Sequence, residues 1–239
     1  DGYIRRGDEV SLSSILTSDR KLLLSGPPRV GKTFLARWIA AGFADDGYEV
    51  KETTDVETAE RFLLDPVNVD RLAVIDDPLG GAHEVQNPLR VLSRLDRLVA
   101  RLQPNRRLIV AQAQDRLLQV TRKTRLADVP AAGTEWQDLS EISTAFSSGL
   151  WAQLVEQYAI PRALSENVRC AIETKTLRLE PGCLAYLAAN HTQISDAGDI
   201  RAIERYARRE ASELGRALDD EGMKPVAMAM AVSTVASVP

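Results

Sequence analysis

One stretch of the chain follows the pattern G-x-x-x-x-G-K-[ST], and it reads Gly26-Pro27-Pro28-Arg29-Val30-Gly31-Lys32-Thr33. Glycines at the two fixed positions permit backbone angles and close approaches that a Cβ atom would block. Successive N–H groups can then surround phosphate oxygens at the positive end of the following helix. Lys32 adds a point charge for the β- and γ-phosphates, and Thr33 offers a hydroxyl ligand to Mg²⁺. The pattern predicts a P-loop that holds a Mg²⁺-bound nucleoside triphosphate, which we expect to be ATP.

The sequence around this loop has the context that the motif requires. Lys21–Ser25 is short and apolar, which is typical of a buried strand, and Lys32–Phe43 repeats apolar residues with a helical period. A strand, a loop and a helix are therefore expected in that order. We expect the nucleotide to contact the whole loop and the adjacent Phe34.

A second apolar run, Leu72–Ile75, ends in two carboxylates, Asp76 and Asp77. A strand that ends in this way suits a Walker B element. Asp76 is then expected to hold Mg²⁺, directly or through water, and Asp77 to orient or deprotonate the attacking water. The alternative is a strand that merely ends in a polar turn, but a P-loop upstream favours the metal site.

The next apolar run along the chain is Leu108–Ala111. In P-loop ATPases with a second acidic residue, this strand inserts between the P-loop strand and the Walker B strand, and a polar residue at its tip senses the γ-phosphate. Gln112 is the first candidate for this sensor and Arg116 the second. A polar loop start without a sensing role remains an alternative for both residues.

Strand and helix patterns alternate along the first part of the chain, which predicts an α/β fold with a mostly parallel sheet covered by helices. Residues 1–135 are expected to form this P-loop NTPase domain. From Trp136 onward helical patterns dominate, so residues 136–220 are expected to form a mainly helical lid subdomain. The chain does not begin with Met and ends in an apolar stretch, Pro225–Pro239. We therefore expect 221–239 to start a further, truncated domain of a longer protein.

Composition narrows the class of function. The formal net charge is −4, which argues against a dedicated nucleic-acid binder because such domains usually carry a strong basic excess. No apolar run reaches the length of a spanning helix and no secretion signal is present, so a soluble cytoplasmic protein without membrane contact is expected. Cys170 and Cys183 are interpreted as reduced thiols, and His83 and His191 receive no role.

Four arginines recur at helical spacing after the Walker B strand. Arg90, Arg94, Arg97 and Arg101 fall on one face of an expected helix, Leu89–Leu102. A solvated face, a subunit contact that supplies an arginine finger, and a nucleic-acid patch all remain open.

Several short segments together match the pattern of one family. They read Leu22-Leu23-Leu24-Ser25-Gly26-Pro27-Pro28, Gly31-Lys32-Thr33-Phe34-Leu35-Ala36-Arg37, Gly47-Tyr48-Glu49-Val50 and Asp76-Asp77-Pro78-Leu79-Gly80. On these residues the stretch from Tyr3 to about Gly80 resembles the STAND NTPases, signal-transduction ATPases related to AAA+ proteins, and most of all their bacterial branch called novel STAND type 3. The resemblance also suggests that Pro181 is the lid proline that packs on adenine, with Pro161 as the competitor.

Two positions depart from the family pattern. Arg29 stands where the family usually has Gly, and it could restrain the loop or add a phosphate contact. A Gln/Ala sequence replaces the usual Thr-Thr-Arg-like sensor, which leaves hydrolysis open while nucleotide binding is implied.

The resemblance implies a nucleotide-dependent switch. Family members lie between an N-terminal effector and a C-terminal sensor, exchange ADP for ATP after a trigger, and then self-associate, and many bacterial examples act in antiphage defence. We expect a slow ATPase of this kind. The alternatives are an AAA+ motor or loader that remodels DNA or protein, and a nucleotide-gated scaffold that does not hydrolyse.

Overall fold

The computed structural model describes residues 3–80, 85–129, 134–194 and 198–208. The chain divides into two compact units, and the division falls after Phe146. The further domain expected over 221–239 lies outside the described residues, as does the end of the lid expected up to residue 220. None of the described helices is long and apolar enough to cross a bilayer.

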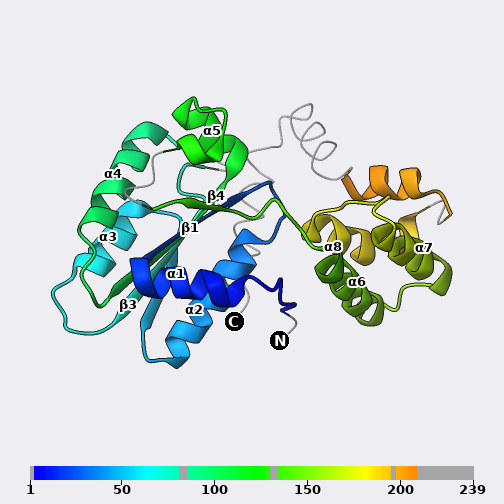
Figure 1. Cartoon of the computed structure of the whole chain (residues 1–239), viewed down its shortest axis with the longest axis horizontal. Helices are drawn as coiled ribbons and strands as arrows, with labels where there is room; N and C mark the ends of the chain where they lie inside the picture. The colour runs from blue at the N-terminus through cyan, green and yellow to red at the C-terminus, as the bar shows by residue number, and fades with distance from the viewer. Residues whose placement is uncertain (1–2, 81–84, 130–133, 195–197, 209–239) are drawn as a thin grey trace. The chain divides into compact units, whose positions relative to one another are not determined.

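The first unit alternates helices and strands (Figure 1). In chain order its elements are α1 (Glu9–Asp19), β1 (Lys21–Gly26), α2 (Lys32–Asp45), β2 (Glu49–Thr53), α3 (Val56–Leu64), β3 (Arg71–Asp76), α4 (Pro88–Ala100), β4 (Arg106–Ala113), α5 (Gln114–Thr121), a 3-10 turn (Leu126–Asp128) and β5 (Trp136–Asp138).

Within the described residues, five strands form one sheet in the order β2-β3-β4-β1-β5, and every pair is parallel. This confirms the predicted α/β class and the predicted insertion of β4 between the P-loop strand and the Walker B strand. Parallel neighbours require crossover connections, and the intervening helices supply them. The carboxyl ends of all the strands therefore meet at one edge of the sheet.

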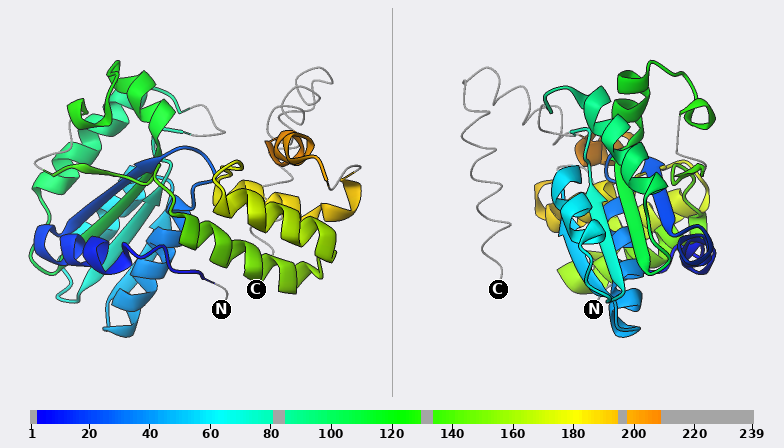
Figure 2. Two further views of the ribbon diagram at one scale, coloured as in Figure 1. Left: turned by 45° about the vertical axis from the view of Figure 1, so that its right-hand side comes forward. Right: turned by 90° about the vertical axis from the view of Figure 1, so that its left-hand side faces the viewer.

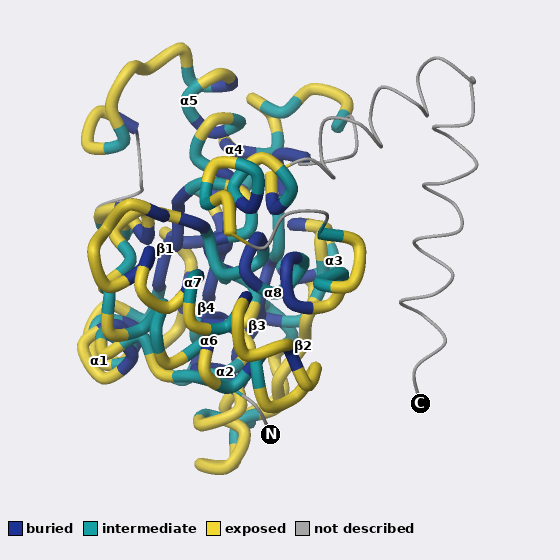
Figure 3. Tube along the Cα trace, turned by 90° about the vertical axis from the view of Figure 1, so that its right-hand side faces the viewer, coloured by how far each residue is buried: buried dark blue, intermediate teal, exposed yellow. Residues whose placement is uncertain are grey.

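Helices cover both faces of the sheet (Figure 2). Leu22 and Leu24 of β1 pack in a cluster with α1 and α2, whereas Leu23 between them packs in a cluster with α3, α4 and α5. This alternation follows from the period of two along a strand. Because both faces are buried, the central strands are apolar almost throughout, and buried residues run along them (Figure 3).

The sheet extends further along the chain than the sequence indicates. Trp136–Asp138 pairs with β1, with Leu23 opposite Trp136 and Ser25 opposite Asp138. The predicted division after residue 135 thus falls before the last strand rather than after it. A three-residue edge strand is too short to carry a period of two, so no sequence pattern marks it.

The second unit is helical where it is described. It contains α6 (Thr144–Tyr158), whose first turn lies before the division, then α7 (Arg162–Glu173), α8 (Pro181–Ala189), a 3-10 turn (His191–Gln193) and a helical segment over 200–208. Its core surrounds Trp151, which is 1% exposed and donates from Nε1 to the Ser165 carbonyl at 3.1 Å.

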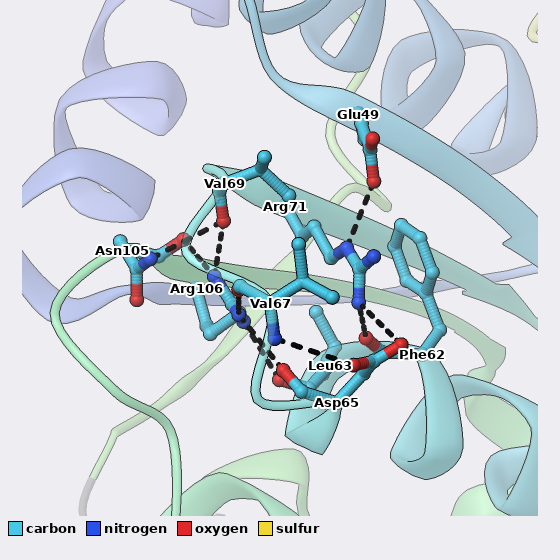
Figure 4. Close-up of polar contacts among 9 residues, drawn as sticks. All are labelled: Glu49, Phe62, Leu63, Asp65, Val67, Val69, Arg71, Asn105 and Arg106. Atoms are coloured by element: carbon cyan, nitrogen blue, oxygen red, sulfur yellow. Dashed lines mark hydrogen bonds and ion pairs between the residues drawn. The ribbon is translucent and has the colours of Figure 1, made fainter.

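A buried guanidinium supports the edge of the sheet opposite to the carboxyl ends (Figure 4). Arg106 is 1% exposed and donates to five backbone carbonyls. These belong to Leu63, Asp65, Val67, Val69 and Asn105. One side chain therefore donates to most of the carbonyls in the loop that joins α3 to β3, where buried backbone groups need hydrogen-bond partners.

Candidate nucleotide site

Three strands bring the predicted residues to one edge of the sheet. Gly26 at the end of β1 is level with Ala113 of β4, and Asp76 at the end of β3 is level with Ala111. The P-loop leaves the sheet at Gly26, so the loop and the carboxylates share the carboxyl edge where ligands bind in open α/β folds.

The P-loop has alternating backbone conformations. Arg29 has a φ of 64° and Gly31 a φ of 95°, both in the left-handed region. A Cβ on Gly31 would point into open space, whereas one on Gly26 would approach Val30 Cγ1 to 3.2 Å. Gly26 is thus needed for close packing and Gly31 for its backbone angle. Arg29, where the family pattern expects Gly, adopts an angle that glycine favours, which costs about 1 kcal/mol or more.

The first turn of α2 is open to a phosphate. Gly31 is its N-cap and no side chain caps the helix. The first intrahelical bond between backbone groups runs from Leu35 N–H to the Gly31 carbonyl at 3.0 Å. The preceding N–H groups of the turn have no helical partner, and they carry the positive end of the helix dipole. This end of the helix suits an anion.

Lys32 folds back over the loop. Its side chain is almost fully buried, and Nζ donates to the Pro27 carbonyl at 2.9 Å and to the Gly26 carbonyl at 3.2 Å. Burial lowers the pKa of Lys32, while the charges of Asp77, Asp76 and Asp115 oppose this effect. The ammonium therefore lies in an acidic surrounding and is held at the loop by two carbonyls.

Thr33 and Asp76 meet across the site. The Thr33 hydroxyl lies 2.9 Å from Asp76 Oδ2 and 3.0 Å from Oδ1. Burial raises the pKa of Asp76, with the charges of Asp77 and Glu52 in the same direction, whereas the Thr33 hydrogen bond and Arg37 oppose the rise. The structure thus brings together the hydroxyl and the carboxylate that the sequence assigns to Mg²⁺.

Gln112 fixes the second carboxylate. Its Nε2 donates to Asp77 Oδ1 at 3.2 Å, and its Oε1 accepts from the Leu79 N–H at 2.9 Å. The Ala113 N–H also donates to Asp77 Oδ1, at 2.9 Å. Gln112 is fully buried, and Asp77 has a φ of 47° that its short polar side chain tolerates. Both polar ends of the Gln112 amide are engaged within the protein.

The residues predicted to sense the γ-phosphate or to contact the base lie on α2, α5, α7 and α8. Arg116 lies on α5 and donates to the Leu79 carbonyl at 3.0 Å and to Gln119 at 3.0 Å. Phe34 is 68% exposed beside the P-loop. Pro181 is the first residue of α8 and Pro161 the N-cap of α7, both in the second unit. The roles of these residues in sensing or in base contact stay predictions.

The arginine face of α4 contacts acidic residues of α3. Arg94 pairs with Glu57 at 2.8 Å and with Glu60 at 2.7 Å, and Arg101 pairs with Glu60 at 3.1 Å. Two of the four arginines therefore form ion pairs between neighbouring helices. The sequence spacing did not indicate this role, which differs from a solvated face, a subunit contact and a nucleic-acid patch.

The residues fit Mg²⁺ bound together with a phosphate. Hydroxyl and carboxylate oxygens are the hard donors that Mg²⁺ prefers, and Mg²⁺ usually takes only one or two carboxylates and completes its shell with water and substrate phosphates. Among the described residues, no three His, Cys, Asp or Glu side chains group into a metal site. Thr33 and Asp76 would hold the ion from the protein side.

Two further residues lie near the site without a sequence signal. Asp115, at the start of α5, contributes negative charge at Lys32. Arg6 donates from Nη1 to the Val30 carbonyl of the P-loop at 3.0 Å. Both contacts join segments far apart in the sequence, so neither spacing nor composition could have pointed to them.

Known proteins share the fold. The structure matches a Walker-type ATPase of Pyrococcus abyssi with a TM-score of 0.55 at 15% identity, covering 93% of this chain and 77% of that one. It matches S. cerevisiae Hsp104, from a complex with casein, with a TM-score of 0.51 at 15% identity, covering 87% of this chain and 42% of that one. At this identity the likeness shows the fold alone. No curated protein sequence matches significantly.

Family comparison gives the more specific result. Residues 10–144 match the family described as Novel STAND NTPase 3, which is the branch that the P-loop and the Asp-Asp-x-Leu-Gly segment resemble. The match includes every strand of the sheet and the residues that meet at its carboxyl edge. The chain belongs to the Novel STAND NTPase 3 family.

Proposed function

We propose that this chain is the ATP-binding switch module of a larger signalling protein. The observation that carries the proposal is the meeting of Lys32, Thr33 and Asp76 around the open N-terminus of α2. These residues supply a cation, a hydroxyl and a carboxylate where a phosphate chain would lie.

Binding follows from the loop. N–H groups of the P-loop and of the first turn of α2 donate to phosphate oxygens, and the Lys32 ammonium exchanges its carbonyl partners for the β- and γ-phosphates. Thr33 and Asp76 exchange their mutual hydrogen bond for the metal ion. Mg²⁺, when bound, neutralises charge on the phosphates. Because three carboxylates surround Lys32, we expect triphosphate without Mg²⁺ to bind poorly.

Hydrolysis would depend on Asp77. Its carboxylate orients a water molecule or takes a proton from it, as the second acid of a Walker B element. In the structure Oδ1 accepts from Gln112 and from the Ala113 N–H, which draws that oxygen toward β4. Like the switch ATPases that the family resemblance suggests, the chain is proposed to turn over slowly, well below the enzyme median of about 10 per second.

The switch itself would be a change in the relation of the two units. A nucleotide held by the first unit and touched by the second, with Pro181 on the base, biases their arrangement, and the γ-phosphate distinguishes the two states. We further propose that the module self-associates on binding ATP, and that effector and sensor segments flank it in the larger protein. Its role would then be in signalling or antiphage defence.

Three measurements test the proposal: nucleotide binding, molar mass in solution and turnover. Mg²⁺–ATP should bind the wild-type chain, and the molar mass in solution should rise on binding ATP but not ADP. Nucleotide binding without any change of mass would refute the oligomerisation switch and leave a nucleotide-gated scaffold. Turnover well above about one per second would favour a motor over a switch.

A further inference from the structure

A single buried arginine joins the P-loop to the segment that leads into the second unit. The Arg6 side chain is 7% exposed. Its Nη1 donates to the Val30 carbonyl at 3.0 Å, and its Nη2 donates to the carbonyls of Leu139 at 3.1 Å and Glu141 at 3.2 Å. The guanidinium also lies 5.6 Å from the ring centroid of Phe146 in the first turns of α6.

The segment bearing Arg6 is itself anchored. Glu9 is 2% exposed and accepts hydrogen bonds from the backbone N–H groups of Arg6 and Gly7 and from the Tyr3 hydroxyl. The chain before α1 is thereby fixed on the protein body. The backbone that carries Arg6 is therefore held by Glu9 at the start of α1.

The carbonyls that accept from Arg6 belong to two segments, the P-loop and the segment that follows β5. Val30 lies directly before Gly31 in the P-loop, whose N–H groups are proposed to bind the phosphates. Leu139 and Glu141 follow β5, and Leu139 also donates its N–H to Ser25 beside the P-loop, at 2.8 Å. The chain continues from here into α6, the helix that enters the second unit.

We propose that Arg6 is a positioning residue that couples the P-loop to residues 139–146, so that nucleotide binding at the loop stabilises the start of α6. The inference rests on the proposed nucleotide site. It adds the contacts through which nucleotide binding would affect the helix that continues into the second unit. A guanidinium suits this role because its planar fork donates in several fixed directions at once. A lysine at the same position has one ammonium and could not span the three carbonyls.

Hydrogen exchange with and without Mg²⁺–ATP tests the proposal. In the wild-type chain, saturating nucleotide should slow exchange both at 26–33 and at 139–146. In Arg6→Gln, nucleotide should still slow exchange at 26–33 but no longer at 139–146. Affinity should fall by about tenfold or less, the cost of the lost hydrogen bond to the loop.

Arg5→Gln is the matched control. Arg5 is the preceding residue, and its guanidinium lies over the Trp38 ring, 5.6 Å from the centroid, so this variant should behave as the wild type. If Arg6→Gln does not fold, Arg6→Lys replaces it with the charge retained, and loss of coupling is still expected.

The outcomes separate the two claims. Absence of protection at 26–33 in the wild type would refute the nucleotide site itself. Protection at 26–33 without protection at 139–146 in the wild type would overturn the coupling while sparing the site. Protection of 139–146 in the Arg6 variants equal to that in the wild type would also overturn it.

Discussion

The Thr33 hydroxyl lies within hydrogen-bond distance of both carboxylate oxygens of Asp76, 2.9 Å from Oδ2 and 3.0 Å from Oδ1. This contact joins the first turn of α2 to the end of β3 across the carboxyl edge of the sheet. A threonine beside a P-loop lysine and an aspartate at a strand end are unremarkable separately. Their meeting turns two sequence patterns into one candidate metal site.

Thr33→Val tests this site. Valine keeps the shape of the side chain but removes the oxygen, so the gain in triphosphate affinity from Mg²⁺ should fall by about tenfold or more, as for other disrupted metal sites. Nucleotide titrations with and without Mg²⁺ measure that gain. Thr33→Ser, which keeps the hydroxyl, should retain most of it. An undiminished Mg²⁺ effect in Thr33→Val would show that Thr33 is not a ligand.

Gln112→Leu tests how Asp77 is held. Leucine leaves the Leu79 N–H without its acceptor and frees Asp77 Oδ1 of one donor, so unfolding free energy should fall by about 1–3 kcal/mol. Nucleotide affinity should remain close to that of the wild type, while ATP turnover should change. Denaturant unfolding, calorimetric titration of nucleotide and a phosphate-release assay provide the three readouts. Unchanged turnover would remove Gln112 from any role at Asp77.

Glu9 should make the stability of the fold sensitive to acid. Burial alone would raise its pKa, but hydrogen bonds from backbone N–H groups and the Tyr3 hydroxyl lower that pKa below its ordinary value of 4.5. The stability that Glu9 contributes is therefore fully present above about pH 4.5 and is lost as the pH falls through the lower folded pKa. Glu9→Gln should be less stable at neutral pH by about 1–3 kcal/mol.

Denaturant unfolding at several pH values measures this effect. The difference between the wild type and Glu9→Gln should shrink as the pH falls below about 4.5. A difference that is constant with pH would mean that the charge of Glu9 does not matter for folding.

Arg106→Met should destabilise the sheet edge in Figure 4. Methionine fills much of the volume but removes a hydrogen-bond donor from five backbone carbonyls, so a loss of about 3 kcal/mol or more is expected. Arg101→Met is the control, because Arg101 is 61% exposed in its pair with Glu60 and should cost less than about 1 kcal/mol. Equal losses in thermal unfolding would contradict this account of Arg106.

Much of the fold follows from local sequence. The helix expected over Lys32–Phe43, from its helical period of apolar residues, is confirmed as α2, which begins at Lys32 and ends two residues later, at Asp45. The order of β1, β4 and β3 is confirmed as well. The strand at Trp136 was not predicted, since three residues at a sheet edge show no period.

The site was less accessible to sequence reasoning. The P-loop pattern identifies its own residues because phosphate and metal binding require those residue types at that spacing. It does not indicate which residues far away in the sequence contact them. The engagement of Gln112 by Asp77 and by the Leu79 N–H depends on strand register. The contact of Arg6 with Leu139 depends on the tertiary fold alone.

Nucleotide binding by Lys32→Ala tests the central claim most directly. Lys51→Ala is the matched control, because Lys51 is exposed on β2 and its ammonium lies over the Phe62 ring. Affinity for Mg²⁺–ATP, measured by calorimetric titration, should fall by at least about tenfold in Lys32→Ala and stay unchanged in Lys51→Ala. Equal affinity of Lys32→Ala and the wild type would contradict the assignment of the P-loop as the nucleotide site.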